Sequence, residues 1–239
     1  MSRALVSAVA AVTAVVTLLS GCTEASHRCD DRPEPSDVRG HQRPVEIRPG
    51  GKRPALAGAA AARAVPAAGR GASDTERILV RLQRETLLMA DDLRPVRPGR
   101  CTGGELPDRA GATARCTVLY ADVEVPWRVR ITDTPRDTSR DAAADSRPRY
   151  EIRPLTSVHT ARAVYAAYAW HVGRSDAAGP LAPRDPRCDR LPDVFTAEPG
   201  EDTGYYCQDI LWSCRNGDFD FAWNDLPVRA DEHGEVSFE

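Results

Sequence analysis

The chain has 239 residues, of which 41% are hydrophobic and 28% are charged, and its formal net charge is −3. These values are ordinary for a soluble globular protein and exclude a fibre or a pore. The charge is unevenly distributed, since 13 acidic residues and three arginines lie between Cys188 and Glu239. This balance is wrong for a nucleic-acid-binding surface, so no nucleic acid is expected as a partner.

The first 21 residues have the layout of a bacterial export signal. Arg3 precedes an uncharged run of Ala, Val and Leu that ends at Leu19-Ser20-Gly21-Cys22. This tetrapeptide has the form of a lipobox, in which small residues admit a signal peptidase and the cysteine sulfur receives a diacylglyceryl group. We expect residues 1–21 to be a signal peptide. Cys22 would then carry the lipid that anchors the chain to the extracellular face of the cell membrane.

Residues 22–73 are rich in Pro, Gly, Ala and Arg and have almost no periodic pattern of large apolar side chains. Such a composition does not bury enough apolar surface to offset the entropy lost on ordering the chain. The prediction for this segment is a disordered stalk that holds the folded part away from the membrane.

A unit made of one helix and a sheet is predicted over residues 74–154. Ser73 and Glu76 form a capping box at the start of the helix. Apolar and polar residues alternate over 117–132, which predicts two antiparallel strands, and Tyr150-Glu151-Ile152 predicts a third. The stripe of the helix that we expect to be buried consists of Ile78, Leu82, Thr86, Met89 and Leu93.

The segment 74–154 also resembles a known family. Its helix is followed by Cys101, a Leu close to an Asp, the stretch Gly-Ala-Thr-Ala-Arg-Cys-Thr at 111–117, and a strand pair. This order is similar to the DUF4333 domains of actinobacterial lipoproteins. The chain differs from the usual family pattern at Thr102-Gly103-Gly104 and in its long loop over 134–147. The resemblance implies a small α+β fold and a place in the cell envelope, and the family carries no assigned activity.

A second, looser copy of the unit is predicted over residues 155–239, with an acidic C-terminal part. Its helix would begin at Thr156 or Ser157 and end at Gly173. The fold class is therefore α+β: two small units of one helix on an antiparallel sheet, each stapled by a disulfide, after a signal peptide and a disordered stalk. The repeated residues are Cys101, Leu106, Cys116, Trp127 and Val129 in the first half, and Cys188, Leu191, Cys207, Trp223 and Val228 in the second.

Six cysteines remain when Cys22 is set aside, and an even number in an exported chain predicts disulfides. We expect Cys101 to pair with Cys116 and Cys188 with Cys207, because each pair brackets a Leu-Pro-Asp turn. Cys29 and Cys214 have no partner by this pattern, although they can reach each other. A competing arrangement pairs Cys207 with Cys214 and leaves Cys188 for Cys29.

No motif for catalysis, metal binding or cofactor binding is present in the sequence. His159 and His171 fall off the apolar stripe of the second helix and are expected to be exposed. The C-terminal aromatic residues are expected to serve mainly in the core. The sequence predicts a non-catalytic envelope lipoprotein without cofactor or metal that binds an envelope protein or a wall polymer. Two alternatives stay open: an envelope hydrolase with an unrecognised carboxylate site, and a structural spacer. The aromatic residues are Tyr205, Tyr206, Trp212, Phe219, Phe221 and Trp223.

Overall fold

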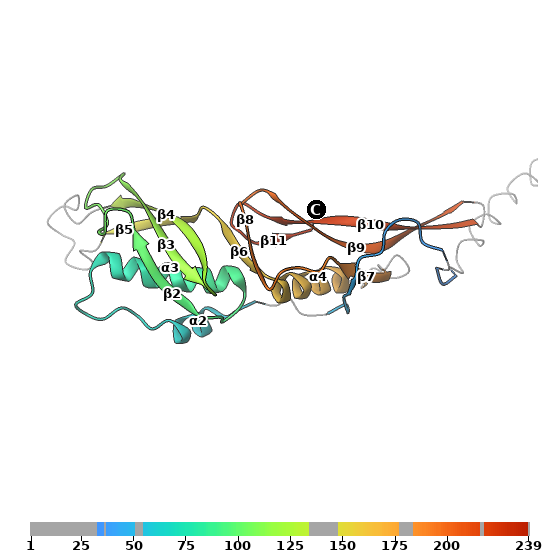
Figure 1. The fold of residues 1–239 in the computed structure, drawn as a ribbon, viewed down its shortest axis with the longest axis horizontal. Coiled ribbons are helices and arrows are strands. Elements are labelled where there is room, and N and C mark those ends of the chain that lie inside the picture. Colours follow the sequence, from blue (N-terminus) through green and yellow to red (C-terminus); the bar gives the residue numbers. More distant parts are fainter. Residues whose placement is uncertain are drawn as a thin grey trace, which may run out of the picture.

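The computed structural model describes residues 33–35, 37–50, 55–133, 148–176, 184–215 and 218–238. Two units lie end to end along the long axis of the molecule (Figure 1). The predicted α+β class is confirmed, because the described residues form three helices and 11 strands, and neighbouring strands of each sheet are antiparallel. No described helix is long and apolar enough to span a bilayer.

The first unit consists of helix α3 (Asp74–Ala90) on one face of a four-stranded sheet. The predicted capping box is present: Glu76 N donates to Ser73 Oγ at 3.2 Å, and Ser73 N donates to the Glu76 carboxylate at 2.7 Å. The strands lie in chain order, which makes the sheet a meander. They are β2 (Val96–Cys101), β3 (Thr113–Tyr120), β4 (Val123–Asp133) and β5 (Arg149–Pro154).

The core of the first unit lies between α3 and the sheet. Trp127 on β4 is 4% exposed, and its indole N–H donates to Thr86 Oγ1 at 3.3 Å. Thr86 therefore belongs to the buried stripe as predicted. Leu93 does not, because α3 ends three residues earlier, and its side chain is 49% exposed. Leu87, which is not one of the five residues predicted for the stripe, is completely buried.

The second unit consists of helix α4 (Ala161–Asp176) on one face of a five-stranded sheet. The prediction of a helix from 156 or 157 is wrong at its start, because β6 (Ser157–Thr160) occupies those residues and pairs with β8 (Val194–Ala197). The long hairpin β9–β10 extends beyond the end of α4 (Figure 1). In sheet order, the five strands are β1 (Val45–Glu46), β7 (Arg184–Cys188), β9 (Asp202–Arg215), β10 (Asp218–Ala230) and β11 (Val236–Ser237).

The two units share one plan. In each, a helix is followed by a meander of four strands, namely β2-β3-β4-β5 and β7-β9-β10-β11. Strand register shows which residues correspond, since Cys116 lies opposite Trp127 and Cys207 lies opposite Leu226. Leu226 rather than Trp223 therefore holds the place of Trp127, which corrects the pairing read from the sequence. Val228 corresponds to Val129 as predicted.

The N-terminal segment, residues 37–50, corrects the prediction of a disordered stalk over 22–73. It contributes β1 to the second sheet and buries Ile47 in the core under α4. Farther along, α2 (Gly58–Ala64) packs on α3 and buries Ala61 and Val65 in the first core. Composition alone predicted disorder because this stretch has no core of its own. It is ordered by the two units that it touches.

Polar contacts join the two units directly. Arg162 at the start of α4 forms an ion pair with Asp92 at 3.0 Å and donates to the Asp91 carbonyl at 3.3 Å. Thr160 Oγ1 donates to the carbonyl of Ala90 at 3.5 Å. The end of α3 is thus fastened to the start of α4, so the two units form one elongated body.

Candidate binding surface

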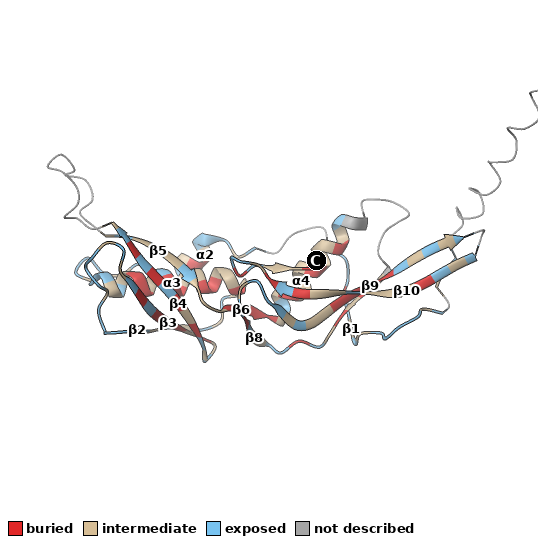
Figure 2. Cartoon of the chain, turned by 90° about the horizontal axis from the view of Figure 1, so that it is seen from above, coloured by how far each residue is buried: buried red, intermediate tan, exposed pale blue. Residues whose placement is uncertain are grey.

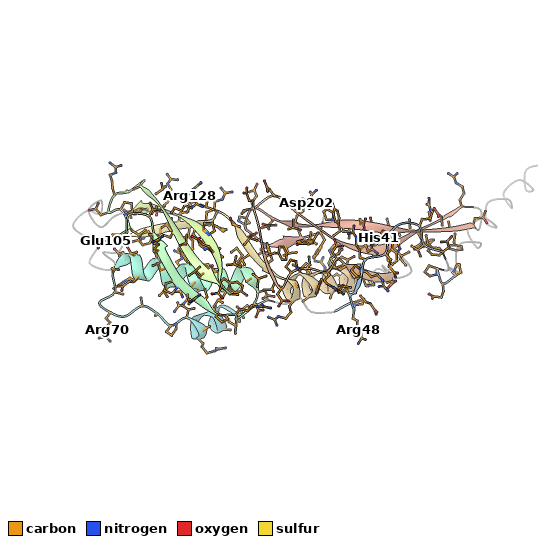
Figure 3. All side chains as sticks on the ribbon, viewed as in Figure 1. His41, Arg48, Arg70, Glu105, Arg128 and Asp202 are labelled. Carbon is orange, nitrogen blue, oxygen red and sulfur yellow. A yellow bond between two sulfur atoms is a disulfide. The ribbon has the colours of Figure 1, made fainter. Side chains whose placement is uncertain are left out.

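The sheet of the first unit has one covered and one open face. Alternate residues of β3 and β4 point toward α3 and are buried, and the residues between them are partly or fully exposed (Figure 2). Figure 3 shows Arg128 on the side of the sheet that faces away from α3. This outer face is therefore open to solvent over the middle of the first unit.

Three arginines lie side by side on the outer face. Arg115 on β3 is directly opposite Arg128 on β4, and Arg128 is directly opposite Arg153 on β5. We call these three residues the arginine row. Because the three residues are directly opposed on neighbouring strands, the row crosses the sheet at right angles to the strands. Neighbouring strands are about 4.8 Å apart.

The arginine row has little compensating charge. All three side chains are exposed and make no ion pair with the described residues. Arg130 adds a fourth cation beside the row and forms an ion pair with Glu151 at 3.9 Å. Among the described residues paired across β3, β4 and β5 on this face, Glu151 is the one acidic residue next to the arginine row. Like charges in directly opposed positions destabilise a sheet, so this arrangement costs stability. It concentrates guanidinium groups, which bind phosphate and carboxylate through paired hydrogen bonds.

The corresponding face of the second unit is covered. Tyr206 and Pro227 lie opposite each other, one residue from the Cys207 and Leu226 pair, and thus hold the places of Arg115 and Arg128. The N-terminal segment crosses the sheet at this level. Its Arg43 guanidinium lies over the Tyr206 ring, 4.9 Å from the centroid.

The covering segment follows a clear path. At the β10 edge, Arg39 N donates to the Phe221 carbonyl at 3.1 Å, and Trp223 N donates to the Arg39 carbonyl at 3.0 Å. At the opposite edge, Val45 pairs with Cys188 of β7. The segment therefore lies across β10, β9 and β7 as an extended chain.

Arg43 fastens this segment to the outer face of the second sheet. Its guanidinium pairs with Asp189 at 2.7 Å and with Asp225 at 3.2 Å. The side-chain amide of Gln208 is oriented so that both its nitrogen and its oxygen are hydrogen-bonded. The nitrogen donates to Asp225 and to the His41 carbonyl, and the oxygen accepts from Arg43 N at 2.9 Å. The buried Gln208 side chain thus hydrogen-bonds to backbone groups of the segment, as a neighbouring strand would.

A groove of about 850 Å³ lies between the two units. Apolar side chains of α3, α4 and the sheet line it, including Leu88, Trp127 and Ala167, together with β5 residues from Glu151 to Pro154 and the turn before β11. His159 borders the groove on β6. Its ring is 2% exposed, which corrects the expectation of an exposed histidine on a helix.

His159 and Ser157 form a buried pair. The serine Oγ lies 2.8 Å from His159 Nε2 and donates to the Ala197 carbonyl at 2.9 Å. Ser157 is completely buried, so its hydroxyl does not reach a substrate in solution. Burial lowers the pKa of His159 to about 4, against the opposing influence of the Asp231 carboxylate. The pair tightens the β6–β8 ribbon rather than forming a nucleophile and base.

The predicted disulfides Cys101–Cys116 and Cys188–Cys207 are both formed, each with a Cα–Cα distance of 3.9 Å. Both join directly opposed residues of neighbouring strands. The competing arrangement is therefore excluded. Cys214 is also disulfide-bonded. Cys22 and Cys29 lie outside the described residues, so the predictions for them stay predictions.

The C-terminal aromatic residues divide between the two faces of the β9–β10 hairpin. Tyr205 packs in the core under α4 against Phe195, with ring centroids 5.4 Å apart. On the opposite face, Phe219 lies between Trp212 and Phe221. Phe221 is buried, but Trp212 and Phe219 are partly exposed, so this group lies on the outer face of the hairpin and corrects the expectation that the aromatic residues serve mainly in the core.

The sequence did not single out the arginine row. The alternation of β4 was read correctly and already places Arg128 and Arg130 on the face opposite Trp127 and Val129. That Arg115 and Arg153 align with Arg128 depends on the register of three strands, which the alternation does not fix.

No family model, no curated protein and no solved structure matches this chain. The resemblance to DUF4333 domains stays a prediction. In the part of the chain that the structure describes, no group of three or more His, Cys, Asp or Glu residues is arranged to hold a metal ion.

Proposed function

We propose that this protein is a lipid-anchored, non-catalytic binding protein of the cell envelope, and that the arginine row binds an extended anionic wall polymer. The observation that carries the proposal is the pair of equivalent faces. The outer face of the second unit holds an extended chain, and the same face of the first unit is open and lined by Arg115, Arg128 and Arg153.

The charge of the open face argues for a polymer with regularly spaced anions. The three arginines start from neighbouring strands about 4.8 Å apart, so their flexible side chains can meet a chain that presents a phosphate or carboxylate at each short repeat. A single small anion is too short to pair with all three arginines and would leave at least one of them unpaired. The like-charge row is best compensated by a ligand that spans all three positions.

The position of the open face on the first unit supports a wall polymer, rather than a membrane surface, as the ligand. The N-terminal segment meets the molecule on the second unit, where Arg39 joins the β10 edge. A lipid on Cys22 would therefore be joined to the body through the second unit. The arginine row lies on the other unit, away from that attachment (Figure 1).

The binding proposal is tested with the mature chain and a synthetic poly(glycerol phosphate), with polyglutamate for comparison. Arg115→Thr and Arg128→Thr should each weaken binding about fivefold, since one exposed basic group near an anionic surface is worth about 1 kcal/mol. Wild-type binding should also weaken steeply as salt is added. Arg190→Thr is the matched control, because Arg190 is an exposed arginine on the second unit.

Two results would overturn this proposal. One is binding of the polymer that is unchanged in Arg115→Thr and Arg128→Thr. The other is binding to vesicles of anionic lipid with no binding to either polymer, which would assign the face to a membrane. The anchor is tested separately: Cys22→Ala should release the protein or stall its processing, and retention of the processed variant in the membrane would refute lipidation.

A further inference from the structure

Among the residues that the structure describes, the outer edge of the first sheet is unpaired. Strand β5 is the last strand of the order β2-β3-β4-β5, and no described strand pairs with its other side. Leu155 N donates to the Pro126 carbonyl at 2.9 Å, which places the backbone groups of Arg153 and Glu151 toward β4. The backbone groups of Tyr150, Ile152 and Pro154 therefore face outward.

We propose that this edge pairs with the same edge of a second copy of the chain, antiparallel and centred on Ile152, to give one continuous eight-stranded sheet. The proposal shares Arg153 with the arginine row, but it rests on the open edge of β5 and not on anion binding, so either one can fail without the other. It is an isologous contact, in which each copy offers the same surface to the other.

The backbone groups of the edge fit this register. Ile152 would face Ile152 of the second copy, and the two residues would exchange both N–H to carbonyl bonds. Tyr150 N–H would donate to the carbonyl of Pro154 in the second copy. Pro154 has no N–H to return, and the Tyr150 carbonyl needs none, because Arg81 already donates to it at 3.4 Å.

The side chains of the edge fit the same register. Glu151 would lie opposite Arg153 of the second copy, and Arg153 opposite Glu151. Within one chain Arg153 faces Arg128, so the second copy would supply the opposite charge that the first sheet lacks at this position. Opposite charges in such cross-strand positions stabilise a sheet, as Arg130 and Glu151 already do at 3.9 Å.

The neighbouring registers are unfavourable. A shift of two residues in one direction places Glu151 opposite Glu151, and a shift in the other places Arg153 opposite Arg153. The charge pattern thus selects one alignment of two copies.

The helix side of the edge is also suited to a second copy. Ile152 points toward α3 and lines the groove with Leu88 and Met89. Arg81 and Glu85 stand on α3 at the same groove, one helical turn apart. A twofold axis through Ile152 would bring an antiparallel α3 to the other side of this space, with Arg81 toward Glu85 of the second copy.

The first test is the association of the full mature chain, measured by sedimentation velocity over a concentration series. Wild type should dimerise, and Arg153→Glu should raise the dissociation constant about tenfold, because two symmetry-related pairs become repulsive. The double variant Arg153→Glu with Glu151→Arg should restore dimerisation, since the swapped charges complement each other again. Ile152→Pro should abolish it, because it removes an outward N–H and leaves the pairing with β4 intact.

The second test is crosslinking of the anchored protein in intact cells. Ile152→Cys should form an intermolecular disulfide, because opposed residues of such a pair have Cα atoms about 5.5 Å apart. Glu151→Cys should form far less, since the register places the two copies of residue 151 in diagonal positions. A wild-type chain that stays monomeric throughout the series, or equal association of all the charge variants, would overturn the proposal. Stronger crosslinking of Glu151→Cys than of Ile152→Cys would do the same.

Discussion

His159 gives the fold a pH dependence that follows from its surroundings. The side chain is 2% exposed, bonded to Ser157 Oγ, and 5.5 Å from the Phe195 ring centroid. Burial is the largest influence on it and lowers its pKa to about 4, while the nearby Asp231 carboxylate acts in the opposite direction. The imidazole is therefore neutral in the folded protein at any pH well above 4.

Unfolding returns His159 to water, where its pKa is about 6.5. Between pH 6.5 and about pH 4 the unfolded chain binds a proton that the folded chain does not, so lowering the pH in this range favours unfolding. The contribution of His159 is complete above pH 6.5 and falls by about 3 kcal/mol on the way to pH 4. Below the folded pKa no further loss arises from this residue.

The measurement compares wild type with His159→Gln, whose amide can bond to Ser157 but does not titrate. Urea unfolding is followed by circular dichroism from pH 7.5 to pH 4. Carboxylates titrate in both proteins, so the difference between the two profiles isolates the histidine. The variant should lose about 3 kcal/mol less stability than wild type across this range. His233→Gln, at an exposed histidine, is the matched control. Parallel profiles for wild type and His159→Gln would show the reasoning to be wrong.

Three further predictions concern stability. Tyr168→Phe should raise the free energy of unfolding by about 1 kcal/mol in chemical denaturation, because the Tyr168 hydroxyl is buried without a hydrogen-bond partner among the described residues; a loss of stability would reveal a partner for it. Removal of the Cys101–Cys116 disulfide by a double serine substitution should cost about 3 kcal/mol in the same assay, since the bond closes 15 residues. Gly173→Ala should loosen the N-terminal segment and speed its proteolysis, because the new Cβ would clash with the Gly50 carbonyl oxygen; an unchanged cleavage rate would contradict this.

Local signals in the sequence were reliable where the contacts they describe are local. The capping box of Ser73 and Glu76, the strand alternation around Trp127 and the repeated Leu-Pro-Asp turn lie within short stretches. The turn also led to both cysteine pairs, because residues that bracket one turn on neighbouring strands come together when the strands pair. These features fixed the fold class and the first unit.

Features that depend on distant contacts were missed. Residues 157–160 were assigned to a helix because Val158 lies at helical spacing from Ala161 and Tyr165, but they pair with β8 some 35 residues later. The N-terminal segment has few apolar residues, and its order comes from Arg43, Ile47 and the partners they meet beyond residue 160. The composition of a segment shows only whether that segment can bury enough apolar surface by itself. It does not show whether the segment folds onto another part of the chain.

The shared plan gives the two sheets equivalent outer faces. Each such face must be covered, made polar or given to a ligand. In the second unit Tyr206 and Pro227 receive the N-terminal segment, and the part-buried ion pair of Arg43 with Asp189 helps to fix it there. In the first unit the same positions are Arg115 and Arg128, which repel each other and make no ion pair with the residues that the structure describes. A merely soluble face could alternate cations and anions at no such cost, so the uniform charge is best explained by a partner that supplies the anions.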